Sequence, residues 1–357
     1  MMQRNMQNRA SASKLAVLAG CVLLGGCQGT ATTSGTDTPS TAEKETVDPG
    51  STALRDSILR EKAILTLMRL SEDEFASVRA NAIEALSHES SRAVEVLPKA
   101  FADENEGVRA VGAMIVGQQR LVGLAEQVRP LVNDPSPYVK SAAIFALMRC
   151  GKTANPTPLS DLLLDSPDGR VRSHVAYLIG EMEDRSAVPL LRDAARQRWK
   201  NLSGAQSKLL ELQIAEALYK LGVQEQIESI RAALYPARAA DLEATALAVQ
   251  IVGNVNDQVS TRQLIHLIDH REQGMPYPPE IRLACASALA KLGQPQGGYV
   301  ADEFADNENP ILRGQAAIVY GDTHKDEFLP KLEILLADRQ PVVQVSAAAA
   351  ILKLLGN

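Results

Sequence analysis

The sequence predicts an all-α solenoid, in which helical hairpins stack side by side along one axis. Three observations lead to this prediction: an amphipathic helical pattern recurs about nine times, its period is close to 31 residues, and turn-forming residues separate the copies. The clearest copy covers residues 139–147, with apolar residues at the first, fifth, eighth and ninth positions and Gly151 beyond the end. Because each copy packs only on its neighbours, a chain of 357 residues needs no division into globular domains.

Residues 1–26 are predicted to be a lipoprotein signal peptide. Three basic residues and no acid precede an apolar run over residues 15–24, which is too short for a stable transmembrane helix. The run ends in Leu24-Gly25-Gly26-Cys27, which resembles the lipoprotein box of bacteria. The resemblance implies that Cys27 becomes the N-terminal residue and carries a diacylglyceryl group and usually an N-acyl chain, which together anchor a protein stably. A plain secretory signal is the alternative.

The segment 27–50, which contains this cysteine, is predicted to be a flexible tether. It is rich in Thr, Ser, Gly, Pro and acidic residues, so it has little to bury and should be disordered. The folded part is then expected to hang from the membrane and touch it only through the lipid. Gln28 follows the cysteine, and the enterobacterial sorting pattern then favours the outer membrane, facing the periplasm. The inner membrane and the cell surface are the alternatives.

A helical array is predicted over residues 51–357. It opens with a capping helix over residues 52–70, where apolar residues have helical spacing. Nine amphipathic helices follow at intervals of 30 to 39 residues, and their first apolar positions are Val78, Val108, Val139, Val171, Leu210, Ala244, Ile281, Leu312 and Val343. The residues five and eight places after each start are apolar in all nine copies, counting Tyr320, which predicts two continuous core columns.

Prolines and glycines mark the predicted ends of these helices. Proline stands two residues before four of the starts, where a first-turn N–H needs no partner. Glycine stands near the carboxyl end of most copies and is predicted to cap the helix there. These residues are Gly117, Gly151, Gly180, Gly222, Gly253, Gly293 and Gly321.

A second helix follows in each copy, as in Ala187-Val188-Pro189-Leu190-Leu191. With Val171-Arg172 and the turn at Asp184, this copy resembles the HEAT-like repeats named after phycobilisome lyases. The resemblance covers about residues 70–357 and implies a right-handed α-solenoid of about nine HEAT-like helical hairpins. It implies lyase activity only through the family name, because this repeat serves many functions.

Two inserts, residues 196–207 and 270–280, lengthen the spacing between copies. The first holds Trp199, the only tryptophan, and the second holds Met275 and Tyr277. We predict that these three residues contact a partner, because Trp and Tyr are enriched at binding hot spots. Packing within its own loop is the alternative for Trp199. The array ends after a first helix, so its last apolar face is expected to be covered by a partner or by a second copy of the chain.

A basic residue follows the start of most first helices. These residues are Arg79, Arg109, Lys140, Arg172, Arg282 and Arg313. Acidic residues in the preceding turns, such as Asp103 and Asp134, favour a ladder of ion pairs that ties each unit to the next. A basic stripe that binds an anionic partner is the alternative, but the acids would cancel its field.

The sequence contains few motifs that are typical of catalytic or metal-binding sites. His266 and His270 have a spacing that would suit one metal, but no third ligand is evident nearby, and we predict neither a metal nor a cofactor. There is no nucleophile elbow, phosphate-binding glycine loop or Cys/His couple. Cys150 and Cys285 are predicted to be buried thiols, since four units separate them.

Composition narrows the function. The chain after residue 26 carries 34 basic and 43 acidic residues, a net charge of −9, which argues against nucleic acid. We therefore predict a lipid-anchored, non-catalytic scaffold of the cell envelope, not an enzyme, that binds a protein or peptide on its curved surface. One alternative is a lyase-like enzyme or a small-ligand or metal receptor on the same repeats. The other is a structural protein that self-associates through its C-terminal face.

Overall fold

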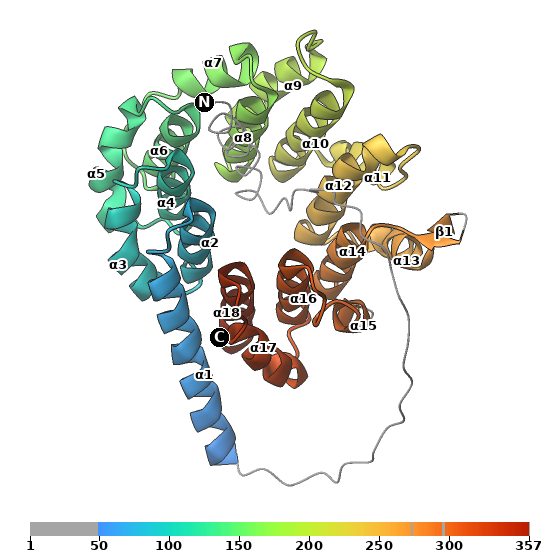
Figure 1. Ribbon diagram of the computed structural model, residues 1–357. Helices are drawn as coiled ribbons and strands as arrows, with labels where there is room; N and C mark the ends of the chain where they lie inside the picture. The colour runs from blue at the N-terminus through green and yellow to red at the C-terminus, as the bar shows by residue number, and fades with distance from the viewer. Residues whose placement is uncertain (1–48, 273, 295–296, 357) are drawn as a thin grey trace, which may run out of the picture.

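The computed structural model describes residues 49–272, 274–294 and 297–356, and in these ranges the chain is an all-α solenoid (Figure 1). The predicted fold class is therefore confirmed. The predicted signal peptide and most of the tether, including Cys27, lie outside the described residues. The solenoid curves so strongly that its helices surround a central opening (Figure 1).

The first helices of the units line the inner side of this ring (Figure 1). In the described part of the chain they are α2 (Ala76–Leu86), α4 (Glu106–Gln118), α6 (Pro137–Arg149), α8 (Gly169–Glu181), α10 (Gly204–Lys220), α12 (Leu242–Asn254), α14 (Pro279–Lys291), α16 (Pro310–Asp322) and α18 (Pro341–Leu355). All nine predicted starts fall inside these helices. The predicted period therefore corresponds to the observed units.

The second helices, most of them shorter than the first helix of the same unit, form the outer side of the ring (Figure 1). They are α3 (Ser90–Ala100), α5 (Ala125–Val128), α7 (Thr157–Asp165), α9 (Val188–Arg196), α11 (Ile227–Ala232), α13 (Thr261–Asp269), α15 (Gly297–Asp302) and α17 (Leu329–Leu336). The second insert forms a small antiparallel hairpin of β1 (Arg271–Glu272) and β2 (Met275–Pro276), in which Arg271 pairs with Pro276 and Glu272 with Met275. This hairpin projects from the outer side of the ring beside α13 (Figure 1).

The apolar columns form the core between the two layers of helices. The start positions and the residues five and eight places after them are buried in every unit, so both predicted core columns are confirmed. Cys150 and Cys285 are buried free thiols, as predicted. None of the helices in the described ranges combines the length and hydrophobicity needed to cross a membrane.

The glycines near the helix ends fall into two groups, and the prediction that all of them are caps was wrong. Gly151, Gly222 and Gly293 have positive φ and terminate helices. The other four lie inside helices; a Cβ on Gly180 would stand 2.8 Å from Cα of Ala217, for example. In those units the positive φ falls three residues later, at Arg120, Glu183, Asn256 and His324. These glycines therefore allow neighbouring first helices to approach closely.

The two ends of the array meet. The N-terminal helix α1 (Pro49–Leu70) packs along α18, and Leu59, Leu67 and Leu70 of α1 share one core cluster with Ala347 and Ile351 of α18. Helix α2 also contacts α18, so the inner helix of the first unit and the inner helix of the last unit are neighbours (Figure 1). We expected the last apolar face to need a partner or a second copy, and this was wrong because the chain covers that face itself.

We expect Leu67→Ala to destabilise the closed ring. Leu67 is fully buried between the two ends of the chain, so truncation should cost about 2–5 kcal/mol in the free energy of unfolding by urea. Leu65→Ala is the matched control, because Leu65 lies on the same helix but is 56% exposed. Equal stability of the two variants would contradict closure by α1.

Candidate functional site in the lumen of the ring

Closure of the ring creates a cavity between helices that are far apart in sequence. This lumen cavity has a volume of about 520 Å³ and is lined by residues of α2 and α4 from one end of the chain and of α12, α14, α16 and α18 from the other. Its polar wall includes Glu84, His88, Gln250, Lys291, Gln315 and Lys353. An adjoining pocket of about 590 Å³ shares Gln250 and Lys291 with it and continues towards α8 and α10.

A polar column that sequence analysis missed supplies much of this wall. It stands ten residues after each start and consists of His88, Gln118, Arg149, Glu181, Lys220, Asn254, Lys291, Asp322 and Lys353. Eight of these nine residues line the lumen cavity or the adjoining pocket. The signal was present in the sequence, but polar positions on a helical array are usually solvated, and only ring closure makes them face one another.

Glu84 on α2 is the carboxylate with the most altered acidity. It lines the lumen cavity, is only partly exposed, and forms neither a hydrogen bond nor an ion pair with any described residue. Removal from water without a compensating charge disfavours the ionised form, which raises the pKa of Glu84 to about 7. The nearby His88 has its pKa lowered by burial and by the charge of Lys353, and so favours the neutral imidazole.

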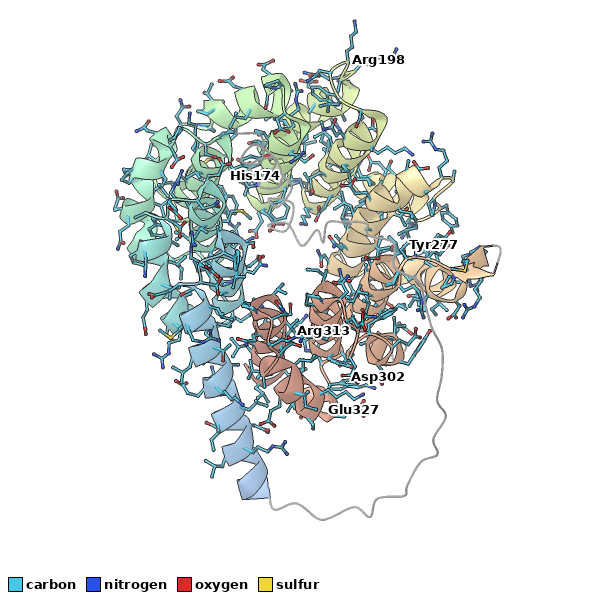
Figure 2. All side chains as sticks on the ribbon, viewed as in Figure 1. His174, Arg198, Tyr277, Asp302, Arg313 and Glu327 are labelled. Atoms are coloured by element: carbon cyan, nitrogen blue, oxygen red, sulfur yellow. The ribbon has the colours of Figure 1, made fainter. Side chains whose placement is uncertain are left out.

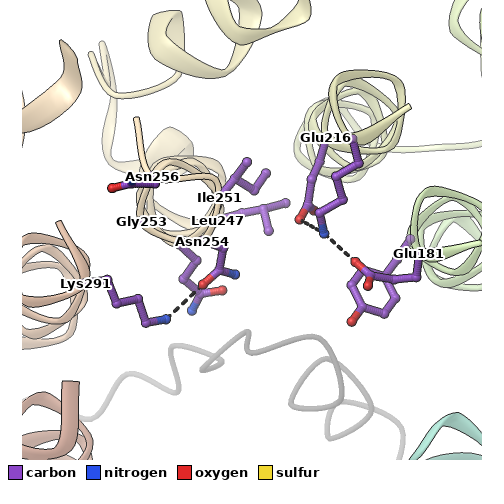
Figure 3. Close-up of a pocket in the computed structure, with 11 residues that line it drawn as sticks. Glu181, Glu216, Leu247, Ile251, Gly253, Asn254, Asn256 and Lys291 are labelled. Atoms are coloured by element: carbon purple, nitrogen blue, oxygen red, sulfur yellow. Dashed lines mark hydrogen bonds and ion pairs between the residues drawn. The ribbon is translucent and has the colours of Figure 1, made fainter. Parts of the chain in front are cut away.

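Two glutamates and a lysine bridge α8 and α10 at the adjoining pocket (Figure 3). Lys220 donates to Glu181 and Glu216 at 2.5 and 2.6 Å, and its ammonium lies 5.2 Å from the ring centroid of Tyr177. Burial acts to lower the pKa of Lys220, but the two carboxylates outweigh it and raise that pKa. Lys220 is therefore held as a cation whose charge is already matched.

The remaining two lysines of the lumen differ in their partners. Lys353 on α18 pairs with Asp322, which is 3% exposed and also accepts from the hydroxyl of Ser287. Lys291 donates to Oδ1 of Asn254 at 2.9 Å, a neutral acceptor (Figure 3). Lys291 therefore has no ion-pair partner in the described part of the chain, and its positive charge lies where the lumen cavity and the adjoining pocket meet.

Two glutamine side chains in the cavity wall are incompletely satisfied. Gln315 on α16 is 8% exposed, and its buried Oε1 has no hydrogen-bond partner among the described residues. The same holds for Oε1 of Gln250 on α12. A buried acceptor without a donor costs about 1–3 kcal/mol, so such groups call for an explanation.

The basic residues of the predicted ladder lie away from this cavity, at the turns between units. Arg79, Arg109 and Arg313 pair with Asp103, Asp134 and Asp338 of the following turns at 2.8 to 2.9 Å, and Arg282 pairs with Glu303 at 2.7 Å. Arg79 also donates to the carbonyl oxygen of Asp73 in its own preceding turn. No ion pair with Lys140 is found within the described ranges.

Arg172 departs from the pattern of the other arginines. It is 5% exposed, donates to the carbonyl oxygens of Ser166 and Leu164, and its guanidinium carbon lies 3.9 Å from the centroid of the Trp199 ring. Trp199 is half-buried against this arginine of α8. Figure 2 shows Arg198 of the same insert projecting away from the ring.

The second insert also lies outside the lumen. Met275 is 71% exposed, while Tyr277 is half-buried, with its ring 5.8 Å from that of His270 (Figure 2). The His270 ring lies 4.7 Å from that of His266. No group of three or more His, Cys, Asp or Glu residues in the described ranges could hold a metal ion. Partner contact by Trp199, Met275 and Tyr277 stays a prediction.

Comparison with known proteins identifies the repeat. A family model of HEAT repeats matches residues 62–148 and 125–207, so the predicted HEAT-like repeats are confirmed. A deoxyhypusine hydroxylase of Eremothecium gossypii is 25% identical over 281 residues, which cover 74% of this chain and 78% of that protein.

Two solved structures with similar chains are human deoxyhypusine hydroxylase in complex with glycerol and the complex of CpcE and CpcF of phycocyanin lyase from Nostoc sp. The first has 16% identity and a TM-score of 0.36 and covers 86% of this chain and 99% of that chain. The second has 15% identity and a TM-score of 0.41 and covers 76% of this chain and 98% of that chain.

The curated relative corrects the functional prediction. We expected a non-catalytic scaffold and no enzyme, but a relative that spans most of this chain is an enzyme, and that expectation is contradicted. Catalytic sequence motifs join residues that are close together in the chain, whereas the closed ring places residues that are more than 200 positions apart, such as Glu84 and Gln315, in the wall of one cavity.

We expect Glu84→Gln to change how stability depends on pH. Between the ordinary pKa of 4.5 and about 7, folded Glu84 retains a proton that the unfolded chain has lost, so its contribution to stability is lost as pH rises through this window. Glutamine does not titrate, so it avoids that loss. The free energy of unfolding of the variant, relative to that of wild type, should therefore rise by up to about 3 kcal/mol between pH 4 and pH 8. Urea denaturation at several pH values measures this, with Glu104→Gln, a 90% exposed glutamate, as control. Parallel curves for wild type and Glu84→Gln would contradict the raised pKa.

Proposed function

We propose that this protein is an enzyme whose active site is the lumen cavity and that acts on a small molecule there by acid–base chemistry. The observation that carries the proposal is Glu84, a carboxylate without a partner in the described structure and with a pKa of about 7, in the wall of a cavity of about 520 Å³. A cavity of this size falls in the range of small-molecule sites. The relative that covers 74% of this chain is an enzyme, which supports the proposal that this protein is also one.

The acidity of Glu84 suits proton transfer near neutral pH. A general acid–base group is most effective when its pKa lies near the working pH, because both protonation states are then well populated. Ordinary glutamates are almost fully ionised at pH 7 and cannot donate a proton. The Glu84 carboxyl group would accept a proton from the substrate in one step and return it in another.

The other groups of the lumen would bind and orient the substrate. Lys291 offers a positive charge that no carboxylate of the described residues pairs, and Lys353 and Asp322 form an ion pair between the carboxyl ends of α18 and α16. The three hold their positions through partners on neighbouring first helices: Asn254 on α12, Asp322 on α16 and Ser287 on α14. Because these charges are already in place before the substrate binds, they need not reorganise during the reaction, and this preorganisation is a main source of electrostatic catalysis.

We expect Glu84→Gln to slow conversion of the substrate by about 100-fold or more, since general acid–base groups contribute about 10²–10⁴. Because the substrate is not identified, purified protein is incubated with the small-molecule extract of its own host, and mass spectrometry follows which compounds disappear or form. Glu104→Gln, outside the lumen, should convert the same compounds at the wild-type rate. The proposal fails if wild type converts nothing or if Glu84→Gln converts as fast as wild type.

We also propose that the enzyme is held at the cell envelope by a lipid on Cys27, after residues 1–26 have been removed as a signal peptide. The anchor would lie in the outer membrane, and the ring would face the periplasm. The basic start, the short apolar run and the Leu24-Gly25-Gly26-Cys27 sequence support this proposal. Residues 28–48, which are rich in Thr, Ser, Gly and Pro, would then separate the ring from the membrane surface.

Labelling with an alkyne fatty acid in the bacterial host tests the anchor. Wild type should incorporate the label and fractionate with membranes, and Cys27→Ser should lose both properties because the acylated sulfur is missing. Cys21→Ser is the matched control, since Cys21 lies in the apolar run six residues earlier. Label retained by Cys27→Ser would refute this anchor.

A further inference from the structure

The N-terminal helix α1 carries apolar side chains on two opposite faces. One face holds the buried residues that close the ring, such as Ala63 and Leu67. The other face holds Leu54, Ile58 and Leu65, which are 64%, 60% and 56% exposed. At 3.6 residues per turn these three side chains lie within about 40° of one another around the helix, so they form one stripe. In a single copy of the chain this stripe stays open to solvent.

The width and spacing of the stripe favour another helix as its partner. Its members are four and seven residues apart, which is the spacing of the apolar seam between two paired helices. A helix that lies on a lipid surface needs a broader apolar face, of about 100° or more. The amino-terminal part of α1 extends beyond the neighbouring helices, so a second helix can reach it (Figure 1).

Two opposite charges lie next to each other in the middle of the stripe. Glu61 and Lys62 stand between Ile58 and Leu65, and both are exposed. Lys62 forms no ion pair within the described ranges. Glu61 lies 3.3 Å from Arg92 of α3 in a pair that is open to solvent, and its carboxylate can accept further hydrogen bonds.

This order of residues is complementary to itself when two α1 helices pack antiparallel. A two-fold axis that passes between residues 61 and 62 places Ile58 opposite the partner's Leu65 and Glu61 opposite the partner's Lys62. Each contact then occurs twice, as in any interface with two-fold symmetry. A parallel pair would instead bring Glu61 against the partner's Glu61, and like charges would repel.

We infer that two copies of this chain pair through the exposed face of α1, in an antiparallel contact centred on Glu61 and Lys62. Ile58 and Leu65 supply the apolar contact on both sides of these charges, and Leu54 extends it at each end. The contact involves neither the lumen cavity nor the face of α1 that closes the ring, so the inference goes beyond the proposed function and does not depend on it.

The pairing should be weak, because one helix from each copy buries less than the roughly 1,600 Å² of a standard interface. We expect a dissociation constant of about 1–100 µM. The two-fold axis is perpendicular to α1, so Pro49 of each copy lies at the same height along it. Two copies on the proposed lipid anchors would therefore meet on one membrane, where confinement raises their effective concentration.

Sedimentation equilibrium of the full chain, in a detergent that matches the buffer in density, measures the pairing. Ile58→Glu should weaken it at least about 10-fold, because the new carboxylate faces the partner's Leu65. Val259→Glu is the matched control, since Val259 is 71% exposed but lies outside α1, and its dissociation constant should equal that of wild type. Wild type that stays monomeric up to about 100 µM would overturn the inference.

Exchange of the two central charges separates this contact from a general effect on folding. Lys62→Glu brings two carboxylates together at each symmetric contact and should weaken the pairing at least about 10-fold. The double variant Glu61→Lys with Lys62→Glu restores the opposite charges in reverse order and should recover the pairing to within about 3-fold of wild type. Failure of the double variant to recover any pairing would contradict the contact between these residues.

Disulfide formation tests the antiparallel direction. When a chain with Ile58→Cys is mixed with a chain with Leu65→Cys and oxidised, the disulfide should join position 58 to position 65. Cys150 and Cys285 are buried and should not compete. Disulfides that join like positions would overturn the antiparallel arrangement. Monomeric wild type that binds phosphatidylglycerol vesicles, and loses them on Ile58→Glu, would assign the stripe to lipid instead.

Discussion

When α1 buries its apolar side against α18, the two ends of the helical array become neighbours and the solenoid becomes a ring. Leu67 of α1 and Ile351 of α18 are both fully buried in the shared core. An open solenoid of the same units would leave the last apolar face in water, a large cost at about 25 cal/mol per Å². An ion pair across the join, between Arg55 of α1 and Glu333 of α17, is added to this apolar contact.

Closure changes the chemistry of the residues on the inner side. In an open array the side chains of Glu84, Gln250 and Gln315 would face bulk water, which would satisfy their acceptors and keep a carboxylate ordinarily acidic. In the ring they line one cavity, where less water reaches them and charges interact more strongly. Burial in this wall raises the pKa of Glu84 to about 7.

The sequence predicts the units well and their closure poorly, for a definable reason. Each unit is specified locally, by apolar residues at fixed spacing within one helical hairpin, and the period can be read directly. Curvature depends on small rotations between neighbours, set by contacts such as Gly180 against Ala217 and Gly321 against Ala350. Over nine units a small difference in each rotation decides whether the ends meet. The polar column can therefore be found in the sequence, but its position around a lumen cannot.

Unsatisfied polar groups alone would not identify the site. His174 on α8 also has a buried nitrogen without a partner in the described structure, and burial lowers its pKa to about 4. Its ring, however, packs edge-on against Tyr138, and it lines neither the lumen cavity nor the adjoining pocket. A neutral imidazole packed against an aromatic ring is stable in the core, so the position of His174 requires no ligand.

Glu84 is different, because an apolar residue at that position would avoid the desolvation cost that its raised pKa records. Violations of local stability rules that converge on one cavity are typical of functional sites. The convergence of Glu84, Gln250 and Gln315 from three helices therefore distinguishes the lumen from an ordinary packing defect.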